Sequence, residues 1–265
     1  MEFEYKDAEL STGPVRYAVG GGGDGNPILY LHSAGGQRVT PALEILAEKH
    51  RIFTPVFPGF DGTETHAGVA SMQGLADLAH EFGEKVIGDV FDVMGQSFGG
   101  WAGVWYGILH PNPVQQLVLE CPAGFRSADA PELSTDPGDI VARLYAYPDR
   151  RPPEKPADIM QLNREMLHHY HGPSKRDEEA IARLGEIEQL CLIILGTKDT
   201  TIVPECGQLL RHNIPKSLLN YVYDAAHNIE SDQPERLAGL VADFLERGIA
   251  FIVNPGGSEK VTARV

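Results

Sequence analysis

The sequence is poor in cysteine and in basic residues. Its three cysteines, Cys121, Cys191 and Cys206, show no C-x-x-C spacing. An odd, sparse set in apolar segments predicts reduced, packed thiols and excludes a disulfide framework. The 22 lysines and arginines are outnumbered by 37 aspartates and glutamates, which gives a formal net charge of −15. This charge repels phosphate backbones and anionic lipids, so we expect no nucleic-acid partner and no membrane partner.

Long hydrophobic runs are also lacking. No apolar stretch approaches the ~20 residues of a membrane span. The acidic start, Met1 to Asp7, lacks the basic and apolar regions of a signal peptide. These absences favour a soluble, cytoplasmic protein. At 265 residues the chain is long enough for one sizeable core with an insertion, and a homodimer remains open.

Short apolar runs alternate with helical patterns along most of the chain. Phe3–Leu10 and Val15–Val19 flank a Ser-Thr-Gly-Pro turn and predict an antiparallel hairpin. Thr40-Pro41 and Ser71 are typical helix starts. The alternation predicts an α/β fold with a doubly wound, mostly parallel sheet. The runs expected to form its central strands are Ile28–Leu31, Val90–Met94, Leu117–Cys121, Leu190–Leu195 and Leu218–Tyr223.

One region interrupts this alternation. From Gly124 to about Gly185 no convincing strand is present, prolines are frequent, and one helical stripe stops at Gly172-Pro173. We interpret residues 124–185 as an inserted helical cap. The core then comprises residues 1–123 and 186–248, and residues 249–265 form a loosely ordered C-terminal tail.

The most informative motif is Gly95-Gln96-Ser97-Phe98-Gly99, which follows the apolar run ending at Met94 and precedes a helical segment. A strand that turns into a helix within a few residues leaves no room for side chains beside the turn, so glycine is needed on both sides of Ser97. The Ser97 hydroxyl is then exposed. The backbone N–H of Phe98 lies at a helix N-terminus, where it can stabilise an oxyanion.

A serine hydroxyl needs a base, and the base needs an orienting group. His227 lies just beyond the predicted strand Leu218–Tyr223, and Asp199 just beyond the strand before it. Carboxyl ends of parallel strands meet at one edge of a sheet, so both should lie near Ser97. His227 would accept the Ser97 proton, and Asp199 would hold the imidazole.

The elbow motif and the chain order Ser, Asp, His resemble the α/β-hydrolase family. Pro58-Gly59-Phe60-Asp61-Gly62 is similar to a Pro-Gly-Phe-Gly turn of that family, with Asp61 in place of glycine. The resemblance implies a second oxyanion donor after the strand Ile28–Leu31, which aligns with Ala34. Ser33 stands where the family commonly has glycine.

Several site assignments stay open from sequence alone. Some members of the family take the acid from the strand after the elbow helix, which makes Glu120 the alternative to Asp199; otherwise Glu120 tunes a pKa or contacts substrate. Ser33, Tyr145 and Met166 are further candidates for the substrate pocket, although Tyr145 and Met166 fit the cap's own core equally well.

No cofactor and no metal are expected. The glycine-rich segment Gly20–Gly25 precedes a strand instead of linking a strand to a helix, which argues against a dinucleotide site. The histidines of the segment His168–His171 have no glutamate or cysteine at ligand spacing.

The sequence therefore predicts a cofactor-independent serine hydrolase that cleaves a small-molecule carboxylic ester, lactone or thioester through an acyl-enzyme. Two alternatives use the same site: hydrolysis of a carbon–carbon bond in a small diketone, and a perhydrolase or haloperoxidase side reaction. A third is a ligand-binding protein that retains the fold without turnover.

Overall fold

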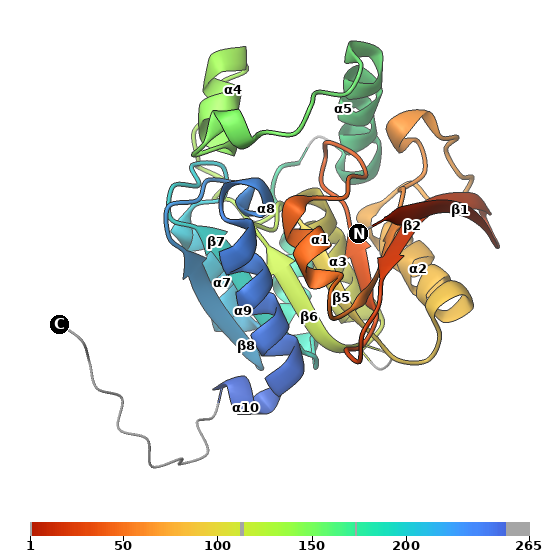
Figure 1. Cartoon of the computed structure of the whole chain (residues 1–265). Coiled ribbons are helices and arrows are strands. Elements are labelled where there is room, and N and C mark those ends of the chain that lie inside the picture. The colour runs from red at the N-terminus through yellow and green to blue at the C-terminus, as the bar shows by residue number, and fades with distance from the viewer. Residues whose placement is uncertain (1, 112–113, 173, 253–265) are drawn as a thin grey trace, which may run out of the picture.

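The computed structural model describes residues 2–111, 114–172 and 174–252. Within them one sheet has the strand order β1-β2-β4-β3-β5-β6-β7-β8 (Figure 1). The strands are β1 Phe3–Leu10, β2 Gly13–Gly21, β3 Ile28–Leu31, β4 Arg51–Pro55, β5 Phe91–Gln96, β6 Val114–Glu120, β7 Leu190–Gly196 and β8 Ser217–Val222.

The sheet is mostly parallel, as predicted. β1 pairs with β2 and β2 with β4 in antiparallel fashion, whereas all pairs from β4–β3 to β7–β8 are parallel. One strand, β4, is not predicted by the apolar pattern. It has only five residues, begins with the exposed Arg51 and ends with Pro55, so its buried centre gives little signal.

Helices cover both faces of the sheet (Figure 1). α1, α8 and α9 pack together on one face, and α2, α3 and α6 form a contiguous group on the other. The helices are α1 Pro41–Leu46, α2 Met72–Phe82, α3 Phe98–Leu109, α4 Pro137–Leu144, α5 Ala157–His171, α6 Glu178–Arg183, α7 Pro204–Asn213, α8 Ile229–Asp232, α9 Pro234–Arg247 and α10 Ile249–Ile252. The doubly wound architecture is confirmed.

The predicted helix starts are those of the structure. The Thr40 hydroxyl accepts a hydrogen bond from the third residue of α1, and Pro41 occupies its first turn. Ser71 caps α2 by accepting a hydrogen bond from the backbone of Gly74 at 3.1 Å. Each side chain satisfies an N–H group that has no partner inside its helix.

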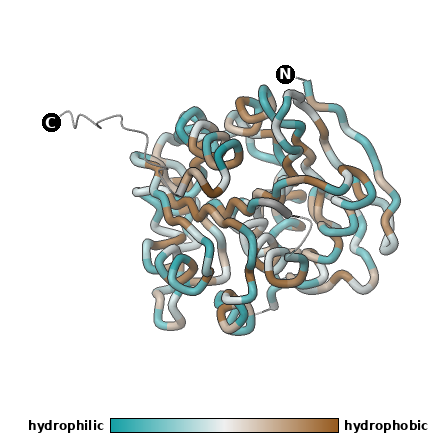
Figure 2. The backbone as a smooth tube through the Cα atoms, turned by 90° about the horizontal axis from the view of Figure 1, so that it is seen from below, coloured by the Kyte–Doolittle hydropathy of each residue, from teal (hydrophilic) through white to brown (hydrophobic). Residues whose placement is uncertain are grey.

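Hydrophobic residues concentrate in the inner strands, as Figure 2 shows. β3 is buried along its whole length, and so are β5 and all but the first residue of β7. A strand buried on both faces of its sheet reads as a continuous apolar run, which is why these strands are visible in the sequence.

The segment 124–185, predicted as a cap, contributes α4, α5 and α6 and no strand among its described residues. α4 and α5 project from the end of the molecule at which the parallel strands terminate (Figure 1). The expected tail begins with the short helix α10, and its residues 253–265 lie outside the described residues. None of the described helices is long and apolar enough to cross a membrane.

Candidate active site

Three parallel strands, β5, β7 and β8, bring Ser97, Asp199 and His227 to one edge of the sheet. Ser97 is the residue between β5 and α3, Asp199 follows β7, and His227 follows β8. All three therefore lie beyond the carboxyl ends of parallel strands, where open α/β sheets place their ligand sites.

The turn that carries Ser97 is strained and close-packed. Ser97 has φ 55° and ψ −109°, a conformation that residues with a side chain rarely adopt. A Cβ on Gly95 would lie 2.2 Å from the carbonyl oxygen of Gly99, and a Cβ on Gly99 would lie 2.0 Å from that of Leu31. Both glycines are thus required by close backbone approach. The Ser97 N–H donates to the Glu120 carbonyl at 2.9 Å, which ties the turn to β6.

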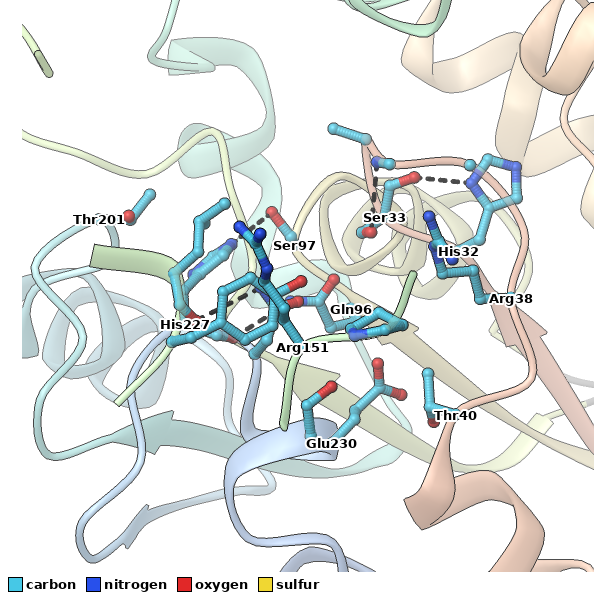
Figure 3. Close-up of a pocket in the computed structure, with 18 of the residues that line it drawn as sticks. His32, Ser33, Arg38, Thr40, Gln96, Ser97, Arg151, Thr201, His227 and Glu230 are labelled. Carbon is cyan, nitrogen blue, oxygen red and sulfur yellow. Dashed lines mark hydrogen bonds between the residues drawn. The ribbon is translucent and has the colours of Figure 1, made fainter. Parts of the chain in front are cut away.

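A hydrogen-bonded chain links the three side chains, and Figure 3 shows its contact between Ser97 and His227. His227 Nδ1 lies 2.9 Å from Asp199 Oδ2, and His227 Nε2 lies 2.8 Å from Ser97 Oγ. An ionised carboxylate only accepts hydrogen bonds, so Nδ1 carries the proton and Nε2 is free to accept one from Ser97. This is the tautomer that a general base requires.

Asp199 is held as an anion although it is buried. Burial alone would raise its pKa, but the attraction of His227 and its hydrogen bond, with two backbone N–H groups, hold the pKa below its ordinary value. The backbone donors are Thr201 at 2.7 Å and Ile202 at 2.9 Å, and both donate to Oδ1. The second oxygen is thereby left to His227.

Backbone N–H groups of Phe98 and Ala34 are the predicted oxyanion donors. Phe98 is the first residue of α3, so its N–H has no partner inside the helix. Ala34 lies on the loop after β3, which His32 shapes: its Nδ1–H donates to the Ser33 carbonyl at 2.7 Å, and its Nε2 accepts from the Phe57 N–H at 3.0 Å. Burial lowers the pKa of His32 to about 4, which keeps this ring neutral.

Ser97 and His227 line a pocket of about 430 Å³. One wall is formed by the loop after β3 and the start of α8, and the other by residues of the segment 124–185. Of the predicted pocket residues, Ser33 and Tyr145 line it, and so does Ala34. The Ser33 hydroxyl accepts a hydrogen bond within its own loop at 3.4 Å.

Two residues expected at the pocket do not line it. Met166 packs toward the core, and its sulfur lies 2.3 Å from where a Cβ on Gly59 would stand. Glu120 is fully buried, and the carboxylate that faces His227 Nδ1 is that of Asp199. Sequence periodicity places Met166 on the buried face of α5 but does not show which neighbour that face meets.

A second carboxylate, that of Glu230, lines the pocket, and the buried Glu120 lies near it without lining the pocket. Tyr30 donates its phenolic hydrogen to Glu230 Oε1 at 2.7 Å. Burial raises the pKa of Glu230 to about 7. Burial and the nearby Glu230 charge raise the pKa of Glu120 well above its ordinary value. Its carboxyl oxygens make no hydrogen bond of ordinary geometry within the described residues, although the Glu230 backbone lies near enough to favour the anion somewhat.

A cluster around Asp61 fastens the loop after β3 to the segment 124–185. Asp61 Oδ2 accepts from the Gln37 N–H at 2.8 Å, and Oδ1 accepts from Lys155 Nζ at 2.5 Å and from Asn163 Nδ2 at 3.0 Å. Asn163 also donates to the Gly35 carbonyl at 3.2 Å. The residue that departs from the family's Pro-Gly-Phe-Gly turn is thus the centre of this contact.

Other pocket residues are not singled out by the sequence. Gln96 precedes Ser97 and donates to the His227 carbonyl at 3.2 Å, so its place beside the motif is a usable signal. Glu230 follows His227 by three residues, and this spacing is a weaker sequence signal. Arg38 and Arg151 also line the pocket, but they lie in loops with no pattern around them.

Cys121, Asp199 and His227 are the described residues whose grouping could hold a metal ion, with one donor atom each within 4.8 Å. Both imidazole nitrogens of His227 already have partners, and burial raises the pKa of the Cys121 thiol well above its ordinary value. A metal at this place would have to displace the hydrogen bond between His227 and Asp199.

Sequence comparison finds hydrolases that are similar to this chain over most of its length. Lipase 1 of Psychrobacter immobilis is 24% identical over 250 residues, which cover 85% of this chain and 79% of the lipase. The 2-hydroxy-6-oxo-2,4-heptadienoate hydrolase of Pseudomonas putida is 25% identical over 251 residues, which cover 84% and 90% of the two chains.

Among solved structures, a serine hydrolase from the polyaromatic hydrocarbon-degrading bacterium Cycloclasticus zankles superposes with a TM-score of 0.73 at 17% identity. The match covers 93% of this chain and 99% of that one, and it shows the shared fold. The model of the alpha/beta hydrolase family matches residues 28–240, from β3 to within α9. Since that match spans well over half of the sequence, the chain belongs to the alpha/beta hydrolase family.

Proposed function

We propose that this α/β-hydrolase-type enzyme cleaves a carboxylic ester, lactone or thioester through an acyl-enzyme formed on Ser97. The observation that carries the proposal is the continuous hydrogen-bonded chain from Ser97 through His227 to Asp199, with the nucleophile at a pocket. Similarity to a lipase supports ester cleavage.

In the first half-reaction, Ser97 Oγ attacks the carbonyl carbon and its proton passes to His227 Nε2. The carbonyl oxygen becomes an oxyanion, to which the backbone N–H groups of Phe98 and Ala34 would donate hydrogen bonds. Collapse of this intermediate breaks the bond to the leaving group, which takes the proton from His227. Asp199 steadies the imidazolium between these two transfers.

In the second half-reaction, water replaces the leaving group. His227 Nε2 removes a proton from the water, and the resulting hydroxide attacks the acyl carbon. The bond to Ser97 Oγ then breaks, and Ser97 regains its proton from His227. Each cycle consumes one water and releases one acid and one alcohol or thiol, which for a lactone are joined in a single hydroxy acid, with no net gain or loss of protons at the site.

A fluorophosphonate probe tests this proposal directly. We expect it to label Ser97, and we expect Ser97→Ala to abolish both labelling and turnover of short aryl esters while the thermal unfolding midpoint changes little. Substantial ester hydrolysis in the alanine variant would overturn the proposed nucleophile. Tight ligand binding without product after long incubation would instead favour a binding protein.

Hydrolysis of a carbon–carbon bond is the second candidate, and similarity to the heptadienoate hydrolase of Pseudomonas putida favours it. The same serine, base and acid would serve both reactions, so the geometry of the three residues does not separate them. Comparing kcat/KM for a vinylogous diketone with that for an aryl ester does. An inert diketone beside a reactive ester would eliminate the carbon–carbon reaction.

A further inference from the structure

The pocket at Ser97 carries an excess of guanidinium groups in an otherwise acidic protein. Arg38, Arg143 and Arg151 all line it. In Figure 3 Arg38 extends from the loop after β3, whereas Arg151 belongs to the segment 124–185. The chain as a whole has 37 acidic against 22 basic residues, so this local excess runs against the overall charge.

These arginines have few anionic partners of their own. Within the described residues, Arg38 makes no hydrogen bond and no ion pair. Arg151 Nη1 lies 3.3 Å from Glu154, whose side chain is largely exposed, so that pair is weakened by solvent. Arg143 donates to the carbonyl of Ser134 at 2.5 Å, and its buried Nε has no hydrogen-bond partner among the residues that the structure describes.

The acidic residues of the pocket do not neutralise this charge. Glu154 is the partner of Arg151 and serves no other arginine of the pocket. Glu230 is engaged by the Tyr30 hydroxyl at 2.7 Å and lies at the start of α8. Because burial raises the pKa of Glu230 to about 7, this group is only partly ionised near neutral pH. Three guanidinium groups therefore face fewer than two full negative charges.

Apolar side chains also line the pocket. A hydrocarbon chain of a substrate could lie against this surface while an end group reaches an arginine. The apolar side chains come from the segment 124–185: Leu133, Ile140, Val141, Leu144, Met160 and Leu167.

We infer that the preferred substrate carries a carboxylate at its end remote from the reacting carbonyl, and that Arg38 and Arg151 bind this carboxylate. This inference rests on the proposed ester hydrolysis and names its substrate class: an ester with a hydrocarbon spacer and a terminal carboxylate. A planar guanidinium binds a carboxylate through two parallel hydrogen bonds, which an uncharged amide of the same shape does not reproduce.

The test compares charged and neutral substrates of matched shape. One series is the monomethyl esters of straight-chain dicarboxylic acids of four to eight carbons, each beside the methyl ester whose far end is a carboxamide. A second pair, 4-acetoxybenzoate and 4-acetoxybenzamide, places the charge on the alcohol side. In at least one of these two sets of substrates, we expect kcat/KM to be about 10- to 100-fold higher for the charged ester than for its neutral counterpart, as charge-assisted hydrogen bonds imply.

Arginine variants then locate the binding group. Arg38→Gln and Arg151→Gln should each lower the ratio of charged to neutral kcat/KM by about tenfold, and the double variant should bring it near one. Arg164→Gln is the matched control, because Arg164 is an exposed arginine of α5 that does not line the pocket. Its ratio should equal that of the wild type. A wild-type ratio of one or less in both substrate series would overturn the inference. Arginine variants that lower kcat/KM equally for the charged and the neutral substrate would overturn it too.

A binding measurement separates this inference from the proposed function. Calorimetry with Ser97→Ala, using the free dicarboxylates and the corresponding diamides, should show tighter dicarboxylate binding that Arg38→Gln removes. Equal affinity for the two would overturn the inference even if esters are hydrolysed. If the fluorophosphonate fails to label Ser97 while the dicarboxylate preference persists, the proposed function fails and the anionic subsite stands.

Discussion

Asp199→Asn should remove most of the activity by fixing the wrong tautomer of His227. Asp199 Oδ1 accepts two backbone hydrogen bonds, from Thr201 at 2.7 Å and Ile202 at 2.9 Å. An asparagine must keep its carbonyl oxygen toward these two donors, so its NH₂ group faces His227 Nδ1. That nitrogen then has to accept, and the proton moves to Nε2, which can no longer accept one from Ser97.

The magnitude follows from the loss of the general base while the backbone contacts stay in place. Removal of the correct tautomer costs about 10³- to 10⁴-fold in kcat, which is about 4 to 5.5 kcal/mol of transition-state stabilisation. Steady-state hydrolysis of a short aryl ester measures it. Because both backbone hydrogen bonds to Oδ1 are kept, circular dichroism and the thermal midpoint should stay close to those of the wild type.

Glu120→Gln is the matched control, since Glu120 is another buried carboxylate near the site and its carboxyl oxygens make no hydrogen bond of ordinary geometry to any described residue. We expect it to retain activity within about tenfold, as it does not contact the imidazole. If Asp199→Asn keeps kcat within tenfold while Glu120→Gln loses a thousandfold, the acid has been assigned to the wrong residue and the tautomer argument is refuted.

Two further outcomes follow from packing and from charge. Gly99→Ala places a Cβ 2.0 Å from the Leu31 carbonyl oxygen, so we expect loss of soluble folded protein or of all activity; a fully active variant would refute the close approach. Burial raises the pKa of Glu230 from 4.5 to about 7, so the folded state binds more protons at this group, and the stability that it contributes is lost as pH rises through this window. Relative to Glu230→Gln, the free energy of unfolding should drop by about 3 kcal/mol between pH 4.5 and 7 in urea titrations, and a constant difference would contradict the shift.

The candidate catalytic residues could be identified from the sequence because the position of each depends on local chain geometry. Ser97 needs two glycines within its own turn, and the structure shows both pressed against backbone atoms. Asp199 and His227 each stand a few residues beyond an apolar run, and the ends of parallel strands bring such positions together whatever the helices between them do. Sequence order is sufficient to place all three at one edge.

The pocket was not predictable in the same way, because its walls meet only in three dimensions. Met166 lies on a helical stripe that fits a pocket or a core equally well, and only its contact with Gly59 decides for packing. Glu230 became significant once the fold placed it beside Tyr30, which lies 200 positions earlier in the chain. Arg38 is an isolated basic residue in a loop, with no periodicity to mark it.

The Asp61 cluster joins these two parts of the site, and this has a consequence for specificity. Lys155 and Asn163 belong to the segment that lines the pocket, yet through Asp61 and Gly35 they hold the loop that carries the Ala34 N–H. The ion pair is about four-fifths shielded from solvent, so its hydrogen bonds are worth more than those of an exposed pair. A change that moves this segment to admit a different substrate should therefore also move the Ala34 N–H, the proposed oxyanion donor. We therefore expect changes at this contact to alter selectivity and rate together, whereas the hydrogen bond between His227 and Asp199 involves none of its residues.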